Sequence, residues 1–314
     1  MIRHACICIL ALATTRLDAA EAAPTVFAPG VISGPQHDSA PAFTPDGRTV
    51  LFSRSADGKH STILVSHLDN GHWSPPVTAP FSGQWSDMEA SMSPDGRFLV
   101  FISNRPKTPG GKPLDGFFMG RSFPEGGGNL WMVRREGNGW AAPVRLPDIL
   151  NRSDSTFAPS VTADGTLYFM HPGDDLKHFR LFRSAYVNGT YQEPQPLPFS
   201  DGTVTDVDPA VAPDESFVVF GSGRVPARQI DLFIAFRDGG QWGTPIHLGN
   251  VVNSAGSDAE ARLSPDHRTL YFASDRLTDA PSGSTRADWD DGKYNIWQVS
   301  LQPWLDAHAK AAHP

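Results

Sequence analysis

The chain has 314 residues and a formal net charge of −8, with 29 glycines, 28 prolines and two cysteines. Its length is enough for one large domain with a sizeable core, and its acidic balance argues against a nucleic-acid groove or an anionic membrane surface as partner. The many turn-forming residues, without a long amphipathic stretch, favour a turn-dense all-β protein.

The first 23 residues resemble a secretory signal peptide. Arg3 precedes the apolar run CICILALA, and small residues follow in LDAAEAA. The run is too short to span a bilayer, so cleavage near Ala22 or Ala23 is expected, and an uncleaved anchor is the alternative. Cys6 and Cys8 both lie in this segment. The mature chain would therefore lack cysteine and a transmembrane segment and be periplasmic or secreted.

A short phrase then recurs five times along the chain. Its copies are FTPDGRTVLF, MSPDGRFLVF, VTADGTLYF, VAPDESFVVF and LSPDHRTLYF, and their turn aspartates are Asp46, Asp95, Asp164, Asp214 and Asp266. Pro presets φ, Asp bonds its own backbone and Gly tolerates positive φ, so each phrase predicts a tight turn between two strands. Glu215 and His267 replace the glycine in two copies, which predicts that these two turns are slightly strained or of another type.

Each copy belongs to a longer unit that predicts a propeller blade. The turn aspartates lie 49, 69, 50 and 52 residues apart, and each of the first four units ends in Trp-x-x-Pro or a variant. A period near 50 built from short strands is typical of β-propellers. We predict an all-β propeller of five blades, each with four antiparallel strands named a to d from the channel outwards; six blades is the alternative.

The predicted propeller domain covers residues 24–302, followed by a C-terminal tail at 303–314. Its repeats occupy about residues 34–80, 81–150, 151–200, 201–252 and 253–302. The fifth repeat lacks a strand d, whereas PTVFAPGVIS at residues 24–33 matches the strand d segments PVRLPDILN and PIHLGNVVNS. We expect residues 24–33 to complete the last blade and close the ring.

The pattern DxxPxFSPDGxxxxF, with NIW or NLW in strand c, resembles the WD40-like (PD40) repeats of TolB-like propellers. The resemblance covers about residues 24–302 and is specific for the fold rather than for a function. It implies a stand-alone propeller of this type, without the separate preceding domain that TolB itself carries.

Acidic residues recur at two positions of strand a. Eight residues before the turn aspartate stand Asp38, Asp87, Thr156, Asp206 and Asp258, and six before it stand Ala40, Glu89, Ala158, Asp208 and Glu260. A spacing of two places both side chains on one face of a strand. Because strand a lines the channel, we expect these acids around one channel mouth.

Three interpretations of the acids stay open. The first is ion pairing with the arginines that end strand b, Arg54, Arg105, Arg224 and Arg276, which would lower the carboxylate pKa values. The second is a Ca²⁺ site, since several converging carboxylates can bind this hard cation, which prefers oxygen ligands; the sequence does not indicate which residues would be the ligands. The third is hydrolysis of a glycosidic bond, with Asp87, Glu89, Asp208 and Glu260 as the catalytic acids.

Two long b-to-c loops, residues 104–128 and 275–294, are expected on the same face as the acids. They carry the aromatic residues Phe117, Phe118 and Trp289. Apolar side chains in a long loop indicate a lid or a partner contact, and folding down over the blade edges is the alternative.

We therefore predict a non-catalytic binding or scaffolding module that recognises a cell-envelope protein, a peptide or a glycan, and no nucleic acid. An envelope glycoside hydrolase or lyase is the alternative. The candidate ligand-binding residues are Asp87, Glu89, Arg105, Asp206, Asp208, Asp258, Glu260, Arg276, Phe117, Phe118 and Trp289.

Overall fold

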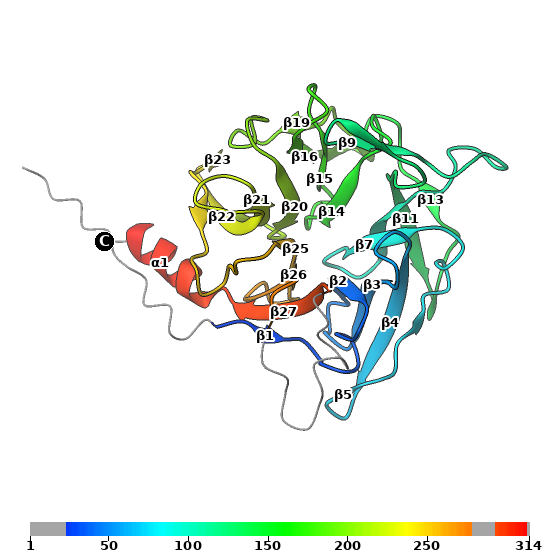
Figure 1. The fold of residues 1–314 in the computed structure, drawn as a ribbon, viewed down its shortest axis with the longest axis horizontal. Coiled ribbons are helices and arrows are strands. Elements are labelled where there is room, and N and C mark those ends of the chain that lie inside the picture. Colours follow the sequence, from blue (N-terminus) through cyan, green and yellow to red (C-terminus); the bar gives the residue numbers. More distant parts are fainter. Residues whose placement is uncertain (1–22, 278–292, 313–314) are drawn as a thin grey trace, which may run out of the picture.

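The structure, a computed structural model, describes residues 23–277 and 293–312. Five antiparallel sheets stand as blades around a central channel (Figure 1). The predicted all-β class and the five-bladed ring are confirmed. The predicted signal peptide, apart from Ala23, lies outside the described residues, as does Trp289.

Three long strands form the body of each blade. Strands a are β2 (His37–Phe43), β7 (Asp87–Met92), β14 (Phe157–Val161), β20 (Asp206–Val211) and β25 (Asp258–Leu263) in blades 1 to 5. Strands b are β3 (Thr49–Ser55), β8 (Phe98–Ser103), β15 (Leu167–Pro172), β21 (Phe217–Ser222) and β26 (Thr269–Ser274). Strands c are β4 (Ser61–Asp69), β11 (Asn129–Glu136), β16 (Phe179–Ser184), β22 (Asp231–Asp238) and β27 (Asn295–Ser300). Strands b and c pair in the same register in different blades: Trp131 lies opposite Phe101 in blade 2, and Phe233 lies opposite Phe220 in blade 4.

The outer part of blades 1 to 4 is broken into two-residue pieces. They are β5 (His72–Trp73) and β6 (Val77–Thr78), β12 (Gly139–Trp140) and β13 (Val144–Arg145), β17 (Tyr186–Val187), β18 (Thr190–Tyr191) and β19 (Gln195–Pro196), and β23 (Gln241–Trp242) and β24 (Ile246–His247). The prolines of the Trp-x-x-Pro segments lie between these pieces. Since proline has no N–H to donate to a ladder, pairing is interrupted there, as suits an edge strand.

The N-terminal strand closes the ring. Strand β1 (Thr25–Val26) pairs antiparallel with β27, with Thr25 opposite Gln298 and Val26 opposite Trp297. The ring of Phe27 then packs edge-on against Tyr271 of blade 5, with 5.0 Å between ring centroids. The last blade is thus completed by residues from the other end of the chain, as the sequence predicted.

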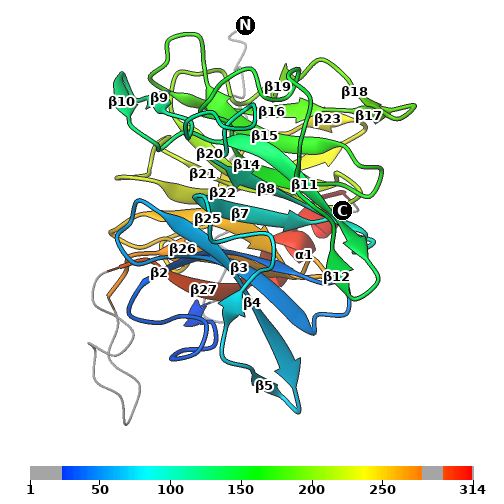
Figure 2. The same cartoon turned by 90° about the vertical axis from the view of Figure 1, so that its right-hand side faces the viewer.

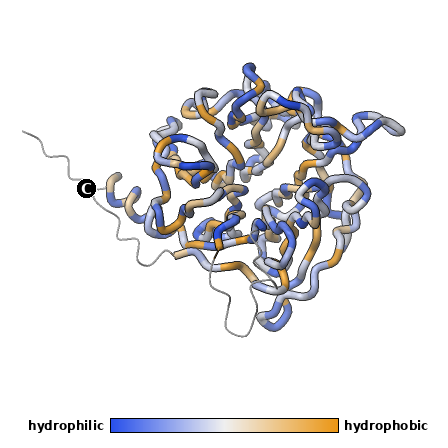
Figure 3. The backbone as a smooth tube through the Cα atoms, viewed as in Figure 1, coloured by the Kyte–Doolittle hydropathy of each residue, from blue (hydrophilic) through white to orange (hydrophobic). Residues whose placement is uncertain are grey.

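The core lies within and between the blades. Strand b of every blade ends its apolar run in a fully buried phenylalanine, namely Phe52, Phe101, Phe169, Phe220 and Phe272. Burying one such side chain contributes about 1.5–3 kcal/mol. Figure 3 shows the apolar residues concentrated along the strands and polar ones in the loops.

The segment predicted only as a tail contains a helix, α1 (Gln302–Ala312). The hydroxyl of Ser300 accepts a hydrogen bond from the N–H of Gln302 at 3.2 Å, which satisfies one of the free amide donors in the first turn of the helix. Trp304 is 6% exposed, and His308 stacks on Phe236 of blade 4 with 3.9 Å between ring centroids. The helix therefore covers the seam between blades 4 and 5 (Figure 1).

Candidate functional site

Every strand a carries a β-bulge at the same place. Ladder register shifts there in all five blades, and the residue six positions before the turn aspartate has positive φ: Ala40 (48°), Glu89 (55°), Ala158 (53°), Asp208 (56°) and Glu260 (51°). This is backbone geometry that L-residues rarely adopt. The bulge interrupts the alternation from which the sequence placed both acids of a strand on one face.

The acids eight positions before the turn aspartate, which we call the outer acids, form buried ion pairs within their own blades. Arg54 donates to Asp38 at 2.6 Å, Arg105 to Asp87, Arg224 to Asp206 at 2.6 Å, and Arg276 to Asp258 at 2.5 Å. All four aspartates are buried. The ion pairing predicted from the sequence is confirmed, and these side chains hold strand a against the end of strand b.

The pKa values of two paired acids run against the sequence expectation. Burial raises the pKa of Asp38 to about 6, although the hydrogen bond and charge of Arg54 act to lower it. Burial likewise raises the pKa of Asp87 despite the charge of Arg105. The predicted lowering is wrong for both groups because removing a carboxylate from water outweighs the nearby guanidinium.

The acids six positions before the turn aspartate, Glu89, Asp208 and Glu260, are called the inner acids here. They form hydrogen bonds between neighbouring blades. The Oε2 atom of Glu89 accepts a hydrogen bond from the N–H of Ala158 at 2.6 Å, and Oδ2 of Asp208 accepts one from the N–H of Glu260 at 2.9 Å. Each bond therefore runs from one bulge to the bulge of the next blade. Glu89 is 8% exposed and Asp208 is 4% exposed.

Arg262 completes this cluster and was missed by the sequence analysis. Its Nε donates to the carbonyl of Ala90 at 3.4 Å, so its side chain reaches from blade 5 to blade 2. The equivalent residues of the other blades are small: Ala42, Ser91, Ser160 and Ala210. When the five repeats are aligned on the turn aspartate, this position holds alanine or serine in four repeats and arginine in one. That departure is the signal in the sequence that indicates Arg262.

The cluster retains protons near neutral pH. Burial and the charges of Asp208 and Glu260 raise the pKa of Glu89 to about 8, and Arg262 lowers it by less. Burial and the charge of Asp208 raise the pKa of Glu260 to about 7. Burial also raises the pKa of Asp208. Carboxyl groups of this kind can act as proton donors when a substrate reaches them.

The long loop of blade 2 carries the two phenylalanines predicted as ligand contacts. It contains the hairpin of β9 (Gly116–Phe118) and β10 (Arg121–Phe123), which lies beside blade 3 (Figure 2). Phe118 stacks on Phe123 at 4.1 Å and packs on Phe179 of blade 3, whereas Phe117 is 46% exposed. One aromatic thus folds onto a blade and the other faces solvent.

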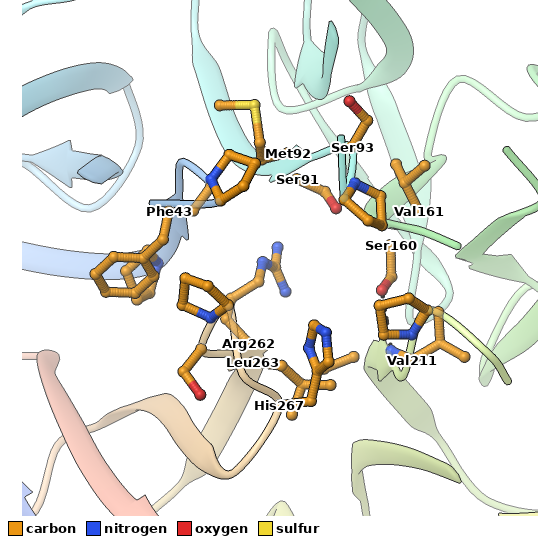
Figure 4. Close-up of a pocket in the computed structure, with 18 of the residues that line it drawn as sticks. Phe43, Ser91, Met92, Ser93, Ser160, Val161, Val211, Arg262, Leu263 and His267 are labelled. Atoms are coloured by element: carbon orange, nitrogen blue, oxygen red, sulfur yellow. Dashed lines mark hydrogen bonds between the residues drawn. The ribbon is translucent and has the colours of Figure 1, made fainter. Parts of the chain in front are cut away.

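A small cavity lies in the channel at the end where the a-to-b turns meet. We call it the channel pocket; it has a volume of about 110 Å³, and Arg262 and His267 extend into it (Figure 4). Its rim is made by turn prolines, of which Pro45 and Pro265 are exposed. Glu89, Asp208 and Glu260 do not line it.

A second and larger cavity, of about 780 Å³, lies between blades 2 and 3. We call it the blade 2–3 groove. Its walls include Phe98, Arg134 and Leu146 of blade 2, and Tyr186 and Tyr191 of blade 3. Sequence reasoning missed this groove because its walls come from segments whose juxtaposition depends on the ring.

The described residues show neither a cluster of metal ligands nor a membrane-spanning helix. Within residues 23–277 and 293–312, no three or more His, Cys, Asp or Glu side chains are grouped so as to hold a metal ion. In the same part of the chain, no helix has the length and apolar character needed to cross a bilayer.

Comparisons with known proteins add the fold alone. No protein-family model and no curated protein matches the chain. A protein of unknown function from Dyadobacter fermentans is similar in structure, with a TM-score of 0.52 and 14% identity, over 88% of this chain and 97% of that one. A putative TolB from Agrobacterium tumefaciens gives 0.48 and 17% (85% and 91% covered), and a gluconolactonase from Xanthomonas campestris gives 0.48 and 14% (90% and 91% covered). At these identities the shared property is the β-propeller fold.

Proposed function

We propose that this chain is a non-catalytic binding module that takes up an amphipathic polypeptide segment of a partner in the blade 2–3 groove. The observation that carries the proposal is that this groove, between blades 2 and 3, occupies the same position in the repeat as the site between blades 4 and 5 where helix α1 packs. Phe98, Arg134 and Leu146 line the groove. By ladder register, they correspond to Phe217, Phe236 and Leu248, which pack in one cluster with Trp304.

The two sites differ in what fills them. In blade 5 the chain leaves strand c as α1, whose Trp304 and His308 occupy the seam with blade 4. In blade 3 it leaves strand c as the β17–β18 hairpin, and a space of about 780 Å³ remains beside Tyr186 and Tyr191. This volume is in the range of well-formed ligand sites. An amphipathic segment with an apolar anchor fits the groove as α1 fits its own seat.

Charge indicates an acidic segment. The groove is lined by Arg97, Arg134 and Arg145 and by two aspartates, Asp95 and Asp164. Arg97 pairs with Asp95 and Arg145 with Asp148, whereas Arg134 forms no ion pair with a described residue. Both aspartates are turn residues that accept hydrogen bonds from their own turns. Arg134 stands where blade 4 has Phe236, so an acidic group beside the apolar anchor has a partner there.

Hydrolysis by the channel acids is the weaker reading on grounds of size and access. The channel pocket has about 110 Å³, whereas ligand pockets typically have about 300–1,000 Å³. The inner acids do not line it, and the outer acids are held in buried ion pairs.

The proposal includes an exported location in the cell envelope and a partner there. It is supported by the resemblance of the N-terminal segment to a signal peptide and by the resemblance of the repeats to those of TolB-like propellers.

The test is selection of a displayed library of amphipathic helical peptides built around an aromatic anchor. One arm carries Glu at the flanking charged positions and the other carries Lys. We expect enrichment of the Glu arm, and reversal of that preference by Arg134→Glu. Arg135→Glu is the matched control, since Arg135 is also exposed but does not line the groove. Failure of the folded protein to enrich either arm, or equal effects of the two variants, refutes the proposal.

A further inference from the structure

One nitrogen of a buried arginine lacks a partner in the channel pocket. Arg262 is 5% exposed; its Nε and Nη1 donate to backbone carbonyls, but Nη2 is buried without a hydrogen bond. Among the described residues, no carboxylate forms an ion pair with this guanidinium. A buried charged donor without a partner is costly, which indicates a missing acceptor.

His267 supplies a second unpartnered group to the same pocket. Its Nδ1 is buried without a hydrogen bond, and its ring extends into the pocket (Figure 4). Burial lowers the pKa of His267, so the imidazole is neutral at physiological pH and donates from Nδ1 in one tautomer. Ser91 and Ser160 line the pocket as well. Two unsatisfied groups from separate positions thus meet at one small cavity.

We propose that the channel pocket binds a single carboxylate group, held by Arg262 with His267 beside it. Guanidinium groups pair well with planar carboxylates. A volume of about 110 Å³ admits a carboxylate on a short substituent but not a sugar ring. The site is separate from the blade 2–3 groove, although Ser93 and Pro94 line both cavities.

The surroundings favour one negative charge over two. Asp208, Glu89 and Glu260 lie close enough to Arg262 that its charge lowers their pKa values. A dianion such as phosphate meets about twice the repulsion that a monocarboxylate meets from whichever of these acids is ionised, so the guanidinium suits the single charge better. The rim at Pro45 and Pro265 is exposed, so the carboxylate can come from a small organic acid or from a polypeptide C-terminus.

The experiment titrates the folded protein with sodium acetate, with a short peptide bearing a free C-terminus, and with the same peptide amidated. Backbone amide NMR shifts report binding. We expect acetate to bind and the amidated peptide not to bind; binding of the free-acid peptide identifies the polypeptide source, and its absence the small acid. Arg262→Ala should weaken acetate binding at least tenfold. It restores the residue type of Ala42 and Ala210, so folding is expected to be retained.

Two further variants make the result specific. His267→Gly, which restores the glycine of Gly47 and Gly96, should weaken acetate binding severalfold without abolishing it. Arg135→Ala removes an exposed arginine that lines neither cavity and should leave binding unchanged. The proposal is overturned if wild type does not bind acetate, if Arg262→Ala binds it equally well, or if Arg135→Ala loses it to the same extent.

Discussion

The carboxyl group of Glu89 accepts a hydrogen bond from the backbone N–H of Ala158, 69 positions further along the chain, at 2.6 Å. Both residues occupy the bulge of their strand a, in blades 2 and 3. A buried carboxyl of raised pKa therefore links two blades, in addition to backbone bonds such as that from the N–H of Thr156 to the carbonyl of Gly128 at 3.0 Å. The protonation of this group and the stability of the ring are coupled.

Stability should fall as pH rises from about 5 to 8. The pKa values of Glu89 and Glu260 are about 8 and 7 in the folded protein, against 4.5 for an ordinary glutamate. The folded state thus binds more protons than the unfolded chain in this window, and the free energy of unfolding decreases with pH. Each unit of pKa difference corresponds to about 1.4 kcal/mol, so a loss of several kcal/mol is expected. Urea unfolding at a series of pH values measures it.

The matched variant is Glu89→Gln, which keeps an acceptor for the N–H of Ala158 but cannot ionise. We expect it to match wild type near pH 5 and to be more stable near pH 8, with a flatter pH profile. An unchanged profile would show that Glu89 does not retain its proton in the folded protein.

Removing one partner of a buried ion pair should destabilise the ring strongly. Asp87→Thr leaves Arg105 without its carboxylate and is expected to lower the free energy of unfolding by about 3–5 kcal/mol. Blade 3 has Thr156 and Gly173 at the corresponding positions. The double variant Asp87→Thr with Arg105→Gly copies blade 3 and should cost less than the single one. A larger loss in the double variant would contradict this account.

The same turn position should respond with opposite sign in two neighbouring blades. Glu215 and His267 both have positive φ, of 61° and 58°, where three other copies have glycine. His267→Gly relieves that strain and should raise stability by about 1 kcal/mol, measured by thermal and urea unfolding.

Glu215→Gly relieves the same strain but removes an acceptor shared by three donors. Tyr168, Arg183 and Arg237 each donate to Glu215 at 2.6–2.7 Å. The net change should be a loss of about 2 kcal/mol. A gain in stability for Glu215→Gly would mean that these bonds contribute nothing beyond what water provides.

Helix α1 should be essential to the seam between blades 4 and 5. Trp304→Ala removes a side chain packed in the cluster of Phe236 and Leu248 and should cost about 3–5 kcal/mol. Lys310→Ala, at an exposed position of the same helix, is the control and should be neutral. Equal stability of the two variants would contradict the packing role of α1.

The repeats made the blade count, the closing strand and the ion pairs predictable, because each follows from residues that recur with the blade period. The bulge was not predictable from two-residue alternation, since Glu89 and its equivalents differ from their neighbours in φ rather than in residue type. Helix α1 had local signals, Ser300 before it and Pro303 in its first turn, but it does not recur and was therefore read as a tail. Arg262 was hidden for the opposite reason, as one departure within an otherwise small-residue position.

The pairing of β1 with β27 sets the order in which this molecule can be completed during synthesis. Val26 leaves the ribosome long before Trp297, its partner. While four blades form, Thr25 and Val26 have no strand to pair with, and the outer edge of blade 5 does not yet exist. Pairing of β1 with β27 joins the strands with the greatest sequence separation among the described residues. The conformational entropy lost on closing this loop is therefore the last such cost in folding. A chain halted before β27 presents unpaired strand edges at both ends of an open arc, which is the state in which association with other chains is most favourable.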